Sequence, residues 1–226
     1  MTIVLSITSL FADIIVWSND NVNLVFDMNL HLRFSRIVLF TLVTMLIYFT
    51  INSSYQNLLL TFGFLLAVIA DYFLIYKNNF QFGIAFFVIV QLLLITRHFN
   101  FDSLCAVSFS KNIKPIIVGL LVFFCIVSFL VAHIPKHKLL LPIIIYAVLL
   151  IISCIAAWYS TYNKIFTSTQ SQYIFIAMVL FFLCDLTVLM PIVFPENIIA
   201  RFARAVTGIF YSLCLLLLTL SAHKNV

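Results

Sequence analysis

The chain alternates between long apolar runs and short polar breaks. A helix needs about 20 mainly apolar residues, within a range of roughly 17–25, to cross the hydrocarbon of a bilayer. This pattern predicts an all-α, polytopic transmembrane helix bundle in which residues 1–226 form a single transmembrane domain. Eight spans are predicted, at about 2–18, 36–52, 57–76, 82–97, 115–134, 139–159, 172–194 and 205–222. Asp13 interrupts the first run, so seven spans with a peripheral first helix is the alternative count.

The polar breaks predict how the spans are connected. Those at 53–56, 77–81 and 135–138 are short enough for tight turns between antiparallel neighbours, and longer loops are predicted at 19–35 and 98–114. Within the first loop, residues 30–36 mix apolar and basic side chains. This segment fits either a helix in the interface plane or a solvated loop.

Composition supports a membrane protein and excludes other classes. The chain is 65% hydrophobic and only 8% charged, whereas soluble domains are about 25% charged. The net charge of +5 comes from Lys and Arg in the breaks, which predicts contact with lipid headgroups and not with nucleic acid. An integral, multi-pass location is expected, in the cell membrane if the chain is bacterial. Oligomeric state has no sequence signal.

The most informative residues are two aspartates inside apolar runs, Asp71 and Asp185. Placing a carboxylate in hydrocarbon costs roughly 3 kcal/mol, so an ionisable residue there indicates a functional site. The two are 114 residues apart, on the third and seventh predicted spans, with loosely similar flanks (LLAVIADYFLIY and VLFFLCDLTVLM). A 4+4 internal duplication would place both carboxyl groups at nearly one depth, on helices that run in the same direction.

Paired carboxyl groups at one depth indicate acid–base chemistry. Two carboxylates close together in a low dielectric do not both ionise easily, so the pair holds one shared proton and supplies an acid and a base. The alternative is that each Asp only locks helix packing. Tyr146 and Tyr211 fall in the same half of the membrane, and their hydroxyl groups need partners. Those partners are Asp71 and Asp185, or else backbone and water.

Other polar residues and motifs narrow the choice. Gln91, within the fourth span, makes either an interhelical hydrogen bond or part of a cavity wall. The five cysteines are an odd count without paired spacing, and the histidines do not cluster, so neither a disulfide framework nor a metal site is expected. No HExxH, CxxC, Gly-rich phosphate loop or GxSxG occurs, which argues against zincin, redox, nucleotide-driven and serine-hydrolase functions.

Two segments resemble signatures of the YhhN/lysoplasmalogenase family of eight-helix membrane proteins. LLAVIADYFLIYKNNFQFGIAFFVIVQ is similar to the first, with Asp71, Phe80, Gly83 and Phe86 or Phe87 at the matching places. AMVLFFLCDLTVLM is similar to the second, with Phe181 or Phe182 and Asp185. Tyr146 and Tyr211 resemble family tyrosines on the sixth and final helices. The chain departs from the family pattern at Ala70 (Gly expected), Cys184 (Ser), Gln91 (His) and Cys214 (Gln).

The resemblance implies hydrolysis of the vinyl-ether bond of a lysoplasmalogen to a fatty aldehyde and a glycerophospho-alcohol. Asp71 and Asp185 would be the acid–base pair, without assignment of which is acid and which is base. Tyr146, Tyr211 and Gln91 would line the cavity, and no metal or organic cofactor is expected. The lysophospholipid headgroup would lie near basic residues at the same membrane face: Lys136, Lys138, Arg201 and Arg204.

Other functions fit the same residues. A proton-coupled lysolipid transporter or flippase would use the aspartates as a proton relay. A catalytically degenerate family member would bind lipid without turnover. An intramembrane aspartyl protease is a further alternative, but the chain lacks the motif pair of those enzymes.

Overall fold

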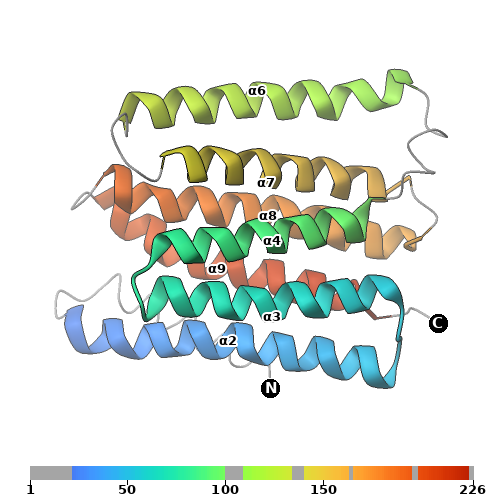
Figure 1. Ribbon diagram of the computed structural model, residues 1–226, viewed down its shortest axis with the longest axis horizontal. Coiled ribbons are helices and arrows are strands. Elements are labelled where there is room, and N and C mark those ends of the chain that lie inside the picture. The colour runs from blue at the N-terminus through green and yellow to red at the C-terminus, as the bar shows by residue number, and fades with distance from the viewer. Residues whose placement is uncertain (1–21, 100–108, 134–139, 163–164, 195–197, 224–226) are drawn as a thin grey trace.

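The computed structural model describes residues 22–99, 109–133, 140–162, 165–194 and 198–223. Some side chains next to the gaps in these ranges are not described, Arg33, Arg201 and Arg204 among them. This part of the chain contains seven helices and no strand (Figure 1): α2 (Val22–Thr50), α3 (Tyr55–Ile75), α4 (Phe80–His98), α6 (Phe109–His133), α7 (Leu140–Ser160), α8 (Ser168–Val193) and α9 (Ile198–Leu220). The predicted all-α class is confirmed.

The helices extend beyond the apolar runs that predicted them. The predicted loop at 19–35 is wrong from Val22 onward, because α2 is continuous through the basic segment 30–36. The predicted loop at 98–114 is likewise wrong from Phe109, and Pro115 lies inside α6. Hydropathy marks only the part of a helix that meets hydrocarbon, whereas backbone hydrogen bonding continues through polar residues outside it. The predicted span 2–18 and Asp13 lie outside the described residues, and eight spans are not confirmed.

Six of the helices pack side by side as a closed ring. Each neighbour in the order α2, α3, α4, α7, α8, α9 is in contact with the next, and α9 returns to α2. The remaining described helix, α6, stands outside this ring and packs on α7, as Figure 1 shows at its upper edge. Gly119 makes that contact close, because a Cβ there would meet Ile155 of α7 at 2.8 Å.

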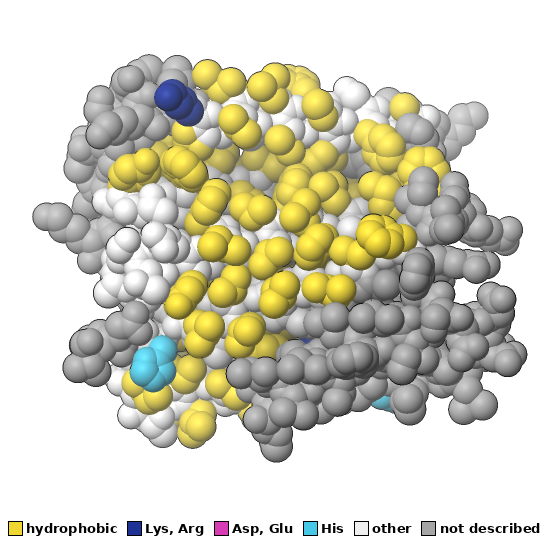
Figure 2. Space-filling model, turned by 180° about the vertical axis from the view of Figure 1, so that it is seen from behind, with side chains coloured by type: hydrophobic (Ala, Val, Ile, Leu, Met, Phe, Trp, Pro, Cys, Tyr) yellow, Lys and Arg dark blue, Asp and Glu magenta, His cyan; other side chains and the backbone are white. Residues whose placement is uncertain are grey.

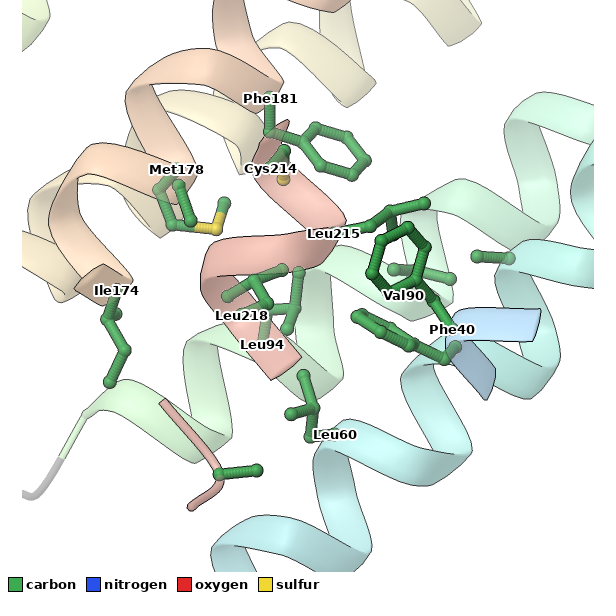
Figure 3. Packing of buried hydrophobic residues seen from close by; sticks show 14 of the residues in the cluster. Phe40, Leu60, Val90, Leu94, Ile174, Met178, Phe181, Cys214, Leu215 and Leu218 are labelled. Carbon is green, nitrogen blue, oxygen red and sulfur yellow. The ribbon is translucent and has the colours of Figure 1, made fainter. Parts of the chain in front are cut away.

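Along the helix axes, one half of the ring is filled by apolar side chains. Leu215 and Leu218 of α9 lie among residues from α2, α3, α4 and α8, including Phe40, Leu60 and Met178 (Figure 3). All of these side chains are nearly or fully excluded from the surface. They come from the first half of α3 and α8 and from the second half of α4 and α9. This half is called the packed half, and the other half of the ring holds the site described below.

The outer surface is apolar enough to face lipid. Among the described residues, four helical segments are long and apolar enough to cross a membrane: Tyr55–Ile75, Phe80–His98, Leu140–Ser160 and Ser168–Pro191. On the face shown in Figure 2, the described side chains are mainly hydrophobic, with a cation and a histidine toward its left edge. Phe49, Leu121 and Phe124 are examples of large apolar side chains that are mostly exposed. The fold is therefore that of a helical membrane bundle.

Candidate active site

The two aspartates that stand out in the sequence each accept a hydrogen bond from a tyrosine on another helix. Tyr211 of α9 donates through its hydroxyl group to Asp71 Oδ2 of α3 at 2.8 Å. Tyr146 of α7 donates to Asp185 Oδ2 of α8 at 2.5 Å. Each buried tyrosine hydroxyl group thus has a carboxyl partner, and each carboxyl group is held in place from a second helix.

All four residues line one cavity of about 400 Å³. Its wall comes from the last turns of α3, the first half of α4, α7 and α9, and the second half of α8. The C-terminal parts of the two aspartate-bearing helices and the N-terminal parts of the two tyrosine-bearing helices therefore lie in this half of the ring. Most of the lining is apolar, and Ile126 of α6 completes it from outside the ring. A cavity of this volume and polarity suits an alkyl or alkenyl chain.

Aromatic rings connect the two Asp–Tyr pairs. Tyr146 packs on Phe87, Phe87 on Phe181, and Phe181 on Tyr211, with ring centroids 6.3, 6.2 and 6.2 Å apart. All four rings belong to the cavity wall. Tilted and edge-to-face contacts at these distances are favourable and restrict ring rotation. The row fixes the positions of the two tyrosine hydroxyl groups relative to each other.

A residue that sequence reasoning did not place in the site is Arg36 of α2. It is 3% exposed and lines the same cavity as Asp71 and Asp185. Its Nη1 donates to the carbonyl oxygen of Gly208 at 2.7 Å and also to Ser212 Oγ, both on α9. Gly208 and Ser212 flank Tyr211 in sequence, so the turn of α9 that positions this tyrosine is also bonded to Arg36.

The two carboxyl groups interact with each other and with this cation. The charge of Asp71 acts on Asp185, and the charge of Arg36 acts on Asp71. Among the described side chains no hydrogen bond joins the two carboxyl groups directly, so the cavity is lined by two separate ionisable groups. An acid and a base that line one mostly apolar cavity are the components of general acid–base catalysis.

Gly83 brings α3 and α4 together beside the site. A Cβ at this position would lie 2.4 Å from Cδ2 of Leu74, which lines the cavity one turn after Asp71. The glycine that matches the first signature thus permits a close helix approach. The same connection includes Asn78, which adopts a positive φ of 47° in the turn and also lines the cavity. The cavity therefore extends toward the end of the helices at the α3–α4 turn.

Three of the four departures from the family pattern are buried beside the site or in the core. Ala70, next to Asp71, is completely buried. Cys184, next to Asp185, lines the cavity, and its thiol contacts the carbonyl oxygen of Thr207 at 3.6 Å. Cys214 is completely buried within the apolar core of the packed half.

The fourth departure, Gln91, is completely buried on α4 and is not among the lining residues. It lies near enough to act on Tyr146, but its side chain makes no hydrogen bond of normal geometry. Of the proposed headgroup residues, Lys136 and Lys138 lie outside the described residues. Arg201 and Arg204 belong to the first turns of α9, at the cavity end of the ring, and their side chains are not described.

A second buried polar cluster, which the sequence analysis did not predict, lies at the end of the packed half. Arg97 at the end of α4 is 1% exposed. It donates to the carbonyl oxygen of Gln56 at 3.2 Å, to His98 Nε2 at 3.0 Å and to Ser221 Oγ at 2.8 Å. It therefore ties α4 to the start of α3 and to the residues after α9. A lone cation at the end of an apolar run gives no sequence signal that separates this role from a headgroup contact.

The fold and site define a helical membrane protein with a pair of tyrosine-bonded carboxyl groups in an apolar cavity. The family model that describes the YhhN family matches residues 30–222, which is most of the chain and contains all four site residues. The protein belongs to the YhhN family, and the resemblance drawn from the two signatures is confirmed. No curated protein and no solved structure matches the chain.

Proposed function

We propose that the protein is a multi-pass membrane hydrolase that cleaves the vinyl-ether bond of a lysoplasmalogen, giving a fatty aldehyde and a glycerophospho-alcohol. The observation that carries the proposal is the pair of carboxyl groups, each held by a tyrosine, in one apolar cavity of about 400 Å³. Membership of the YhhN family supports it. The eight-span topology and a location in the cell membrane, if the chain is bacterial, are part of the proposal.

Acid–base groups suit this substrate because a vinyl ether is stable to base and labile to acid. One carboxyl group protonates the outer carbon of the double bond, and the resulting oxocarbenium ion is stabilised by the partner carboxylate. Water then adds to the cationic carbon and gives up its proton to that partner. The hemiacetal collapses when the partner returns this proton to the glycerol oxygen and the first aspartate takes the hydroxyl proton. The sum is one vinyl ether and one water converted to one aldehyde and one alcohol.

The position of the cavity supports one way of holding the substrate. Its apolar wall takes the alkenyl chain, and Asn78 marks the side nearest the helix ends. We place the phosphate headgroup at this end, where the first turns of α9 contain Arg201 and Arg204. Lys136 and Lys138, which come shortly before α7 in the sequence, are the other proposed headgroup residues. A single-chain lipid lying across the site brings the bond next to its glycerol toward the aspartates.

The test is release of aldehyde by the purified protein in detergent when lysoplasmalogen is supplied. Asp185→Asn is the loss variant, and Thr61→Val, which removes a buried hydroxyl group from the packed half of α3, is the control. The proposal requires aldehyde from the native protein and the control, and none above background from Asp185→Asn. Equal release from all three, or none from the native protein, overturns it. Uptake of intact lysolipid by proteoliposomes along a pH gradient would instead indicate the transporter.

A further inference from the structure

Two neighbouring helices of the ring, α4 and α7, have buried polar side-chain atoms without a hydrogen-bond partner. On α4 these are Nε2 and Oε1 of Gln91 and Nδ1 of His98, and on α7 it is the hydroxyl group of Ser153. All three residues are completely buried. Nearly all buried donors and acceptors in folded proteins bond to protein or to ordered water, because an unpaired one loses its hydration without compensation. These side chains therefore indicate a small polar ligand between the helices.

Ser153 differs in this respect from the other buried hydroxyl groups of the bundle. Every other buried Ser or Thr in the described part of the chain donates to a backbone carbonyl oxygen. In most of them the acceptor lies three or four residues earlier in the same helix, which is the usual way to satisfy a hydroxyl group in an apolar helix. The hydroxyl group of Ser153 is thus left available for a ligand.

The spacing of these residues places them in one row. Gln91 and His98 are seven residues apart on α4, as are Tyr146 and Ser153 on α7, and this spacing returns a side chain to the same helix face. The two helices pack together and run in the same direction (Figure 1). Phe87, one turn before Gln91, packs on Tyr146 and sets their register. At about 1.5 Å of rise per residue, the three side chains follow the tyrosine in steps of about 4.5 to 6 Å.

We propose that single water molecules bound by Gln91, Ser153 and His98 form a path between α4 and α7, which supplies the cavity with water. His98 is the last residue of α4, so the path begins at the end of the ring opposite to the α3–α4 turn. Its purpose rests on the proposed function, because vinyl-ether hydrolysis consumes one water for every lipid cleaved. A lipid whose headgroup lies at the α3–α4 end does not block this route.

At the cavity end, the path meets Tyr146. The tyrosine donates its only hydroxyl hydrogen to Asp185 Oδ2 at 2.5 Å, so its oxygen can only accept a further bond. Gln91 follows Phe87 by one turn and makes no hydrogen bond to the tyrosine itself. A water that donates to the Gln91 carbonyl oxygen and to the phenolic oxygen joins the two. That water lies beside the cavity, next to the carboxyl group that the tyrosine holds.

At the other end, a hydrogen bond from Arg97 fixes the form of His98 that faces the path. A guanidinium group can only donate, so the 3.0 Å bond between Arg97 Nη1 and His98 Nε2 requires Nε2 to accept. A ring whose Nε2 accepts has its hydrogen on Nδ1, which is the atom without a protein partner. His98 therefore offers a donor to an entering water, and the hydroxyl group of Ser153 both accepts and donates further along the row.

The test is hydroxyl-radical footprinting of the purified protein in detergent without substrate. A brief X-ray exposure converts water to hydroxyl radicals, which oxidise the side chains beside it, and peptide mass spectrometry locates the oxidised residues. Leu94 lies on α4 between Gln91 and His98 and is only 1% exposed, and the completely buried Leu60 of α3 is its matched control. We expect Leu94 to be oxidised at least about fivefold faster than Leu60, because bound water lies beside it.

Gln91→Leu removes the amide with little change in size. Oxidation of Leu94 should then fall to the rate of Leu60. Turnover should fall about tenfold with an unchanged KM for the lipid, because a bound water is lost and Gln91 is not among the cavity-lining residues. Gln91→Asn keeps an amide and should retain most of both. Thr61→Val, whose hydroxyl group is bonded within α3, should change neither.

Ser153→Ala is the second and smaller change, and it should slow oxidation of Leu94 at least about twofold by removing one water ligand. Oxidation of Leu94 no faster than that of Leu60 in the native protein overturns the path, as does an unchanged rate in folded Gln91→Leu or Ser153→Ala. Slower oxidation with undiminished turnover in Gln91→Leu overturns its role as the water supply. Footprinting needs no substrate, so the path can hold while the native protein releases no aldehyde, which would overturn the proposed function alone.

Discussion

The two halves of the helix ring bury polar groups in opposite ways. In the packed half, the Arg97 guanidinium group donates to three partners near the helix ends and is surrounded by filled space. In the other half, each aspartate receives one tyrosine hydroxyl group and faces a cavity of about 400 Å³. A buried charge with a complete set of protein partners holds a structure together. A buried acid that lines an apolar cavity is available for chemistry.

This difference also explains why the site tolerates its acids. Burying a charge costs several kcal/mol unless hydrogen bonds and opposite charges compensate it. The packed half supplies rigid walls, since its core joins α2, α3, α4, α8 and α9. The aspartates are therefore held by helices whose positions are set at the other end of the ring. Substitutions in the two halves should consequently separate activity from stability.

The largest expected effect is on turnover in the cavity half. Asp71→Asn and Asp185→Asn should each lower aldehyde release by about 10²- to 10⁴-fold, the usual contribution of general acid–base groups. Thermal unfolding in detergent should change little, because neither side chain fills the packed core. Steady-state rates and melting curves on the same preparations check this. Loss of folded protein in step with activity would erase the distinction between the halves.

The next effect is on stability in the packed half. Arg97→Met should lower the free energy of unfolding by about 3 kcal/mol, because Gln56 and Ser221 then lose a charged donor in a buried setting. Activity per folded molecule should stay near that of the native protein. Denaturation in detergent measures the change, with Lys77→Met as a control because Lys77 is an exposed cation in the α3–α4 turn. Full stability of Arg97→Met would show that the hydrogen bonds around Arg97 are not structural.

A smaller effect is expected from the tyrosines of the site. Tyr146→Phe and Tyr211→Phe each remove one hydrogen bond to a carboxyl group, and a loss of about tenfold in turnover corresponds to about 1.4 kcal/mol. Tyr159→Phe is the matched control, because Tyr159 is a buried tyrosine at the far end of α7 and does not line the cavity. Turnover rates should be lowered in Tyr146→Phe and Tyr211→Phe and unchanged in Tyr159→Phe. Equal rates would mean that the aspartates need no support from the tyrosines.

The smallest effects on stability and on KM are expected from substituting two glycines, one in a close helix contact and one in open space. Gly83→Ala should push Leu74 toward the cavity and cost about 1 kcal/mol of stability, with a raised KM for the lipid. At Gly63, an added Cβ meets nothing within 4 Å. Gly63→Ala should therefore be neutral or stabilise α3 by up to about 1 kcal/mol through helix propensity. Melting temperatures and KM values check the pair, and identical behaviour would contradict the close approach of α3 and α4.

Sequence patterns predicted the parts of this molecule that depend on local composition. Seven of the eight predicted spans overlap described helices, and four of those helices are long and apolar enough to cross a membrane. The cost of a carboxylate in hydrocarbon singled out Asp71 and Asp185. The start of α2 at Val22 was missed because polar residues form helix readily outside the membrane. A 4+4 duplication remains a prediction.

The hydrogen-bond partners of the buried cations Arg36 and Arg97 could not be predicted from the sequence, for a different reason. Arg36 and Arg97 both stand at the edge of an apolar run, where a cation is typical of the membrane interface. Their burial is decided by which helices pack around them, α9 in the first case and the ends of α3 and α9 in the second. Contacts between residues far apart in the chain leave no periodic signal.

The most direct measurement of the central claim is the fate of the proton itself. Lysoplasmalogen is incubated with the protein in D₂O, and the aldehyde is trapped by reduction as it forms and weighed by mass spectrometry. Transfer from a carboxyl group to the vinyl carbon predicts one deuterium on the carbon next to the carbonyl group, and no such product with Asp185→Asn. Aldehyde without deuterium at this carbon, or its undiminished formation by that variant, would contradict the proton transfer.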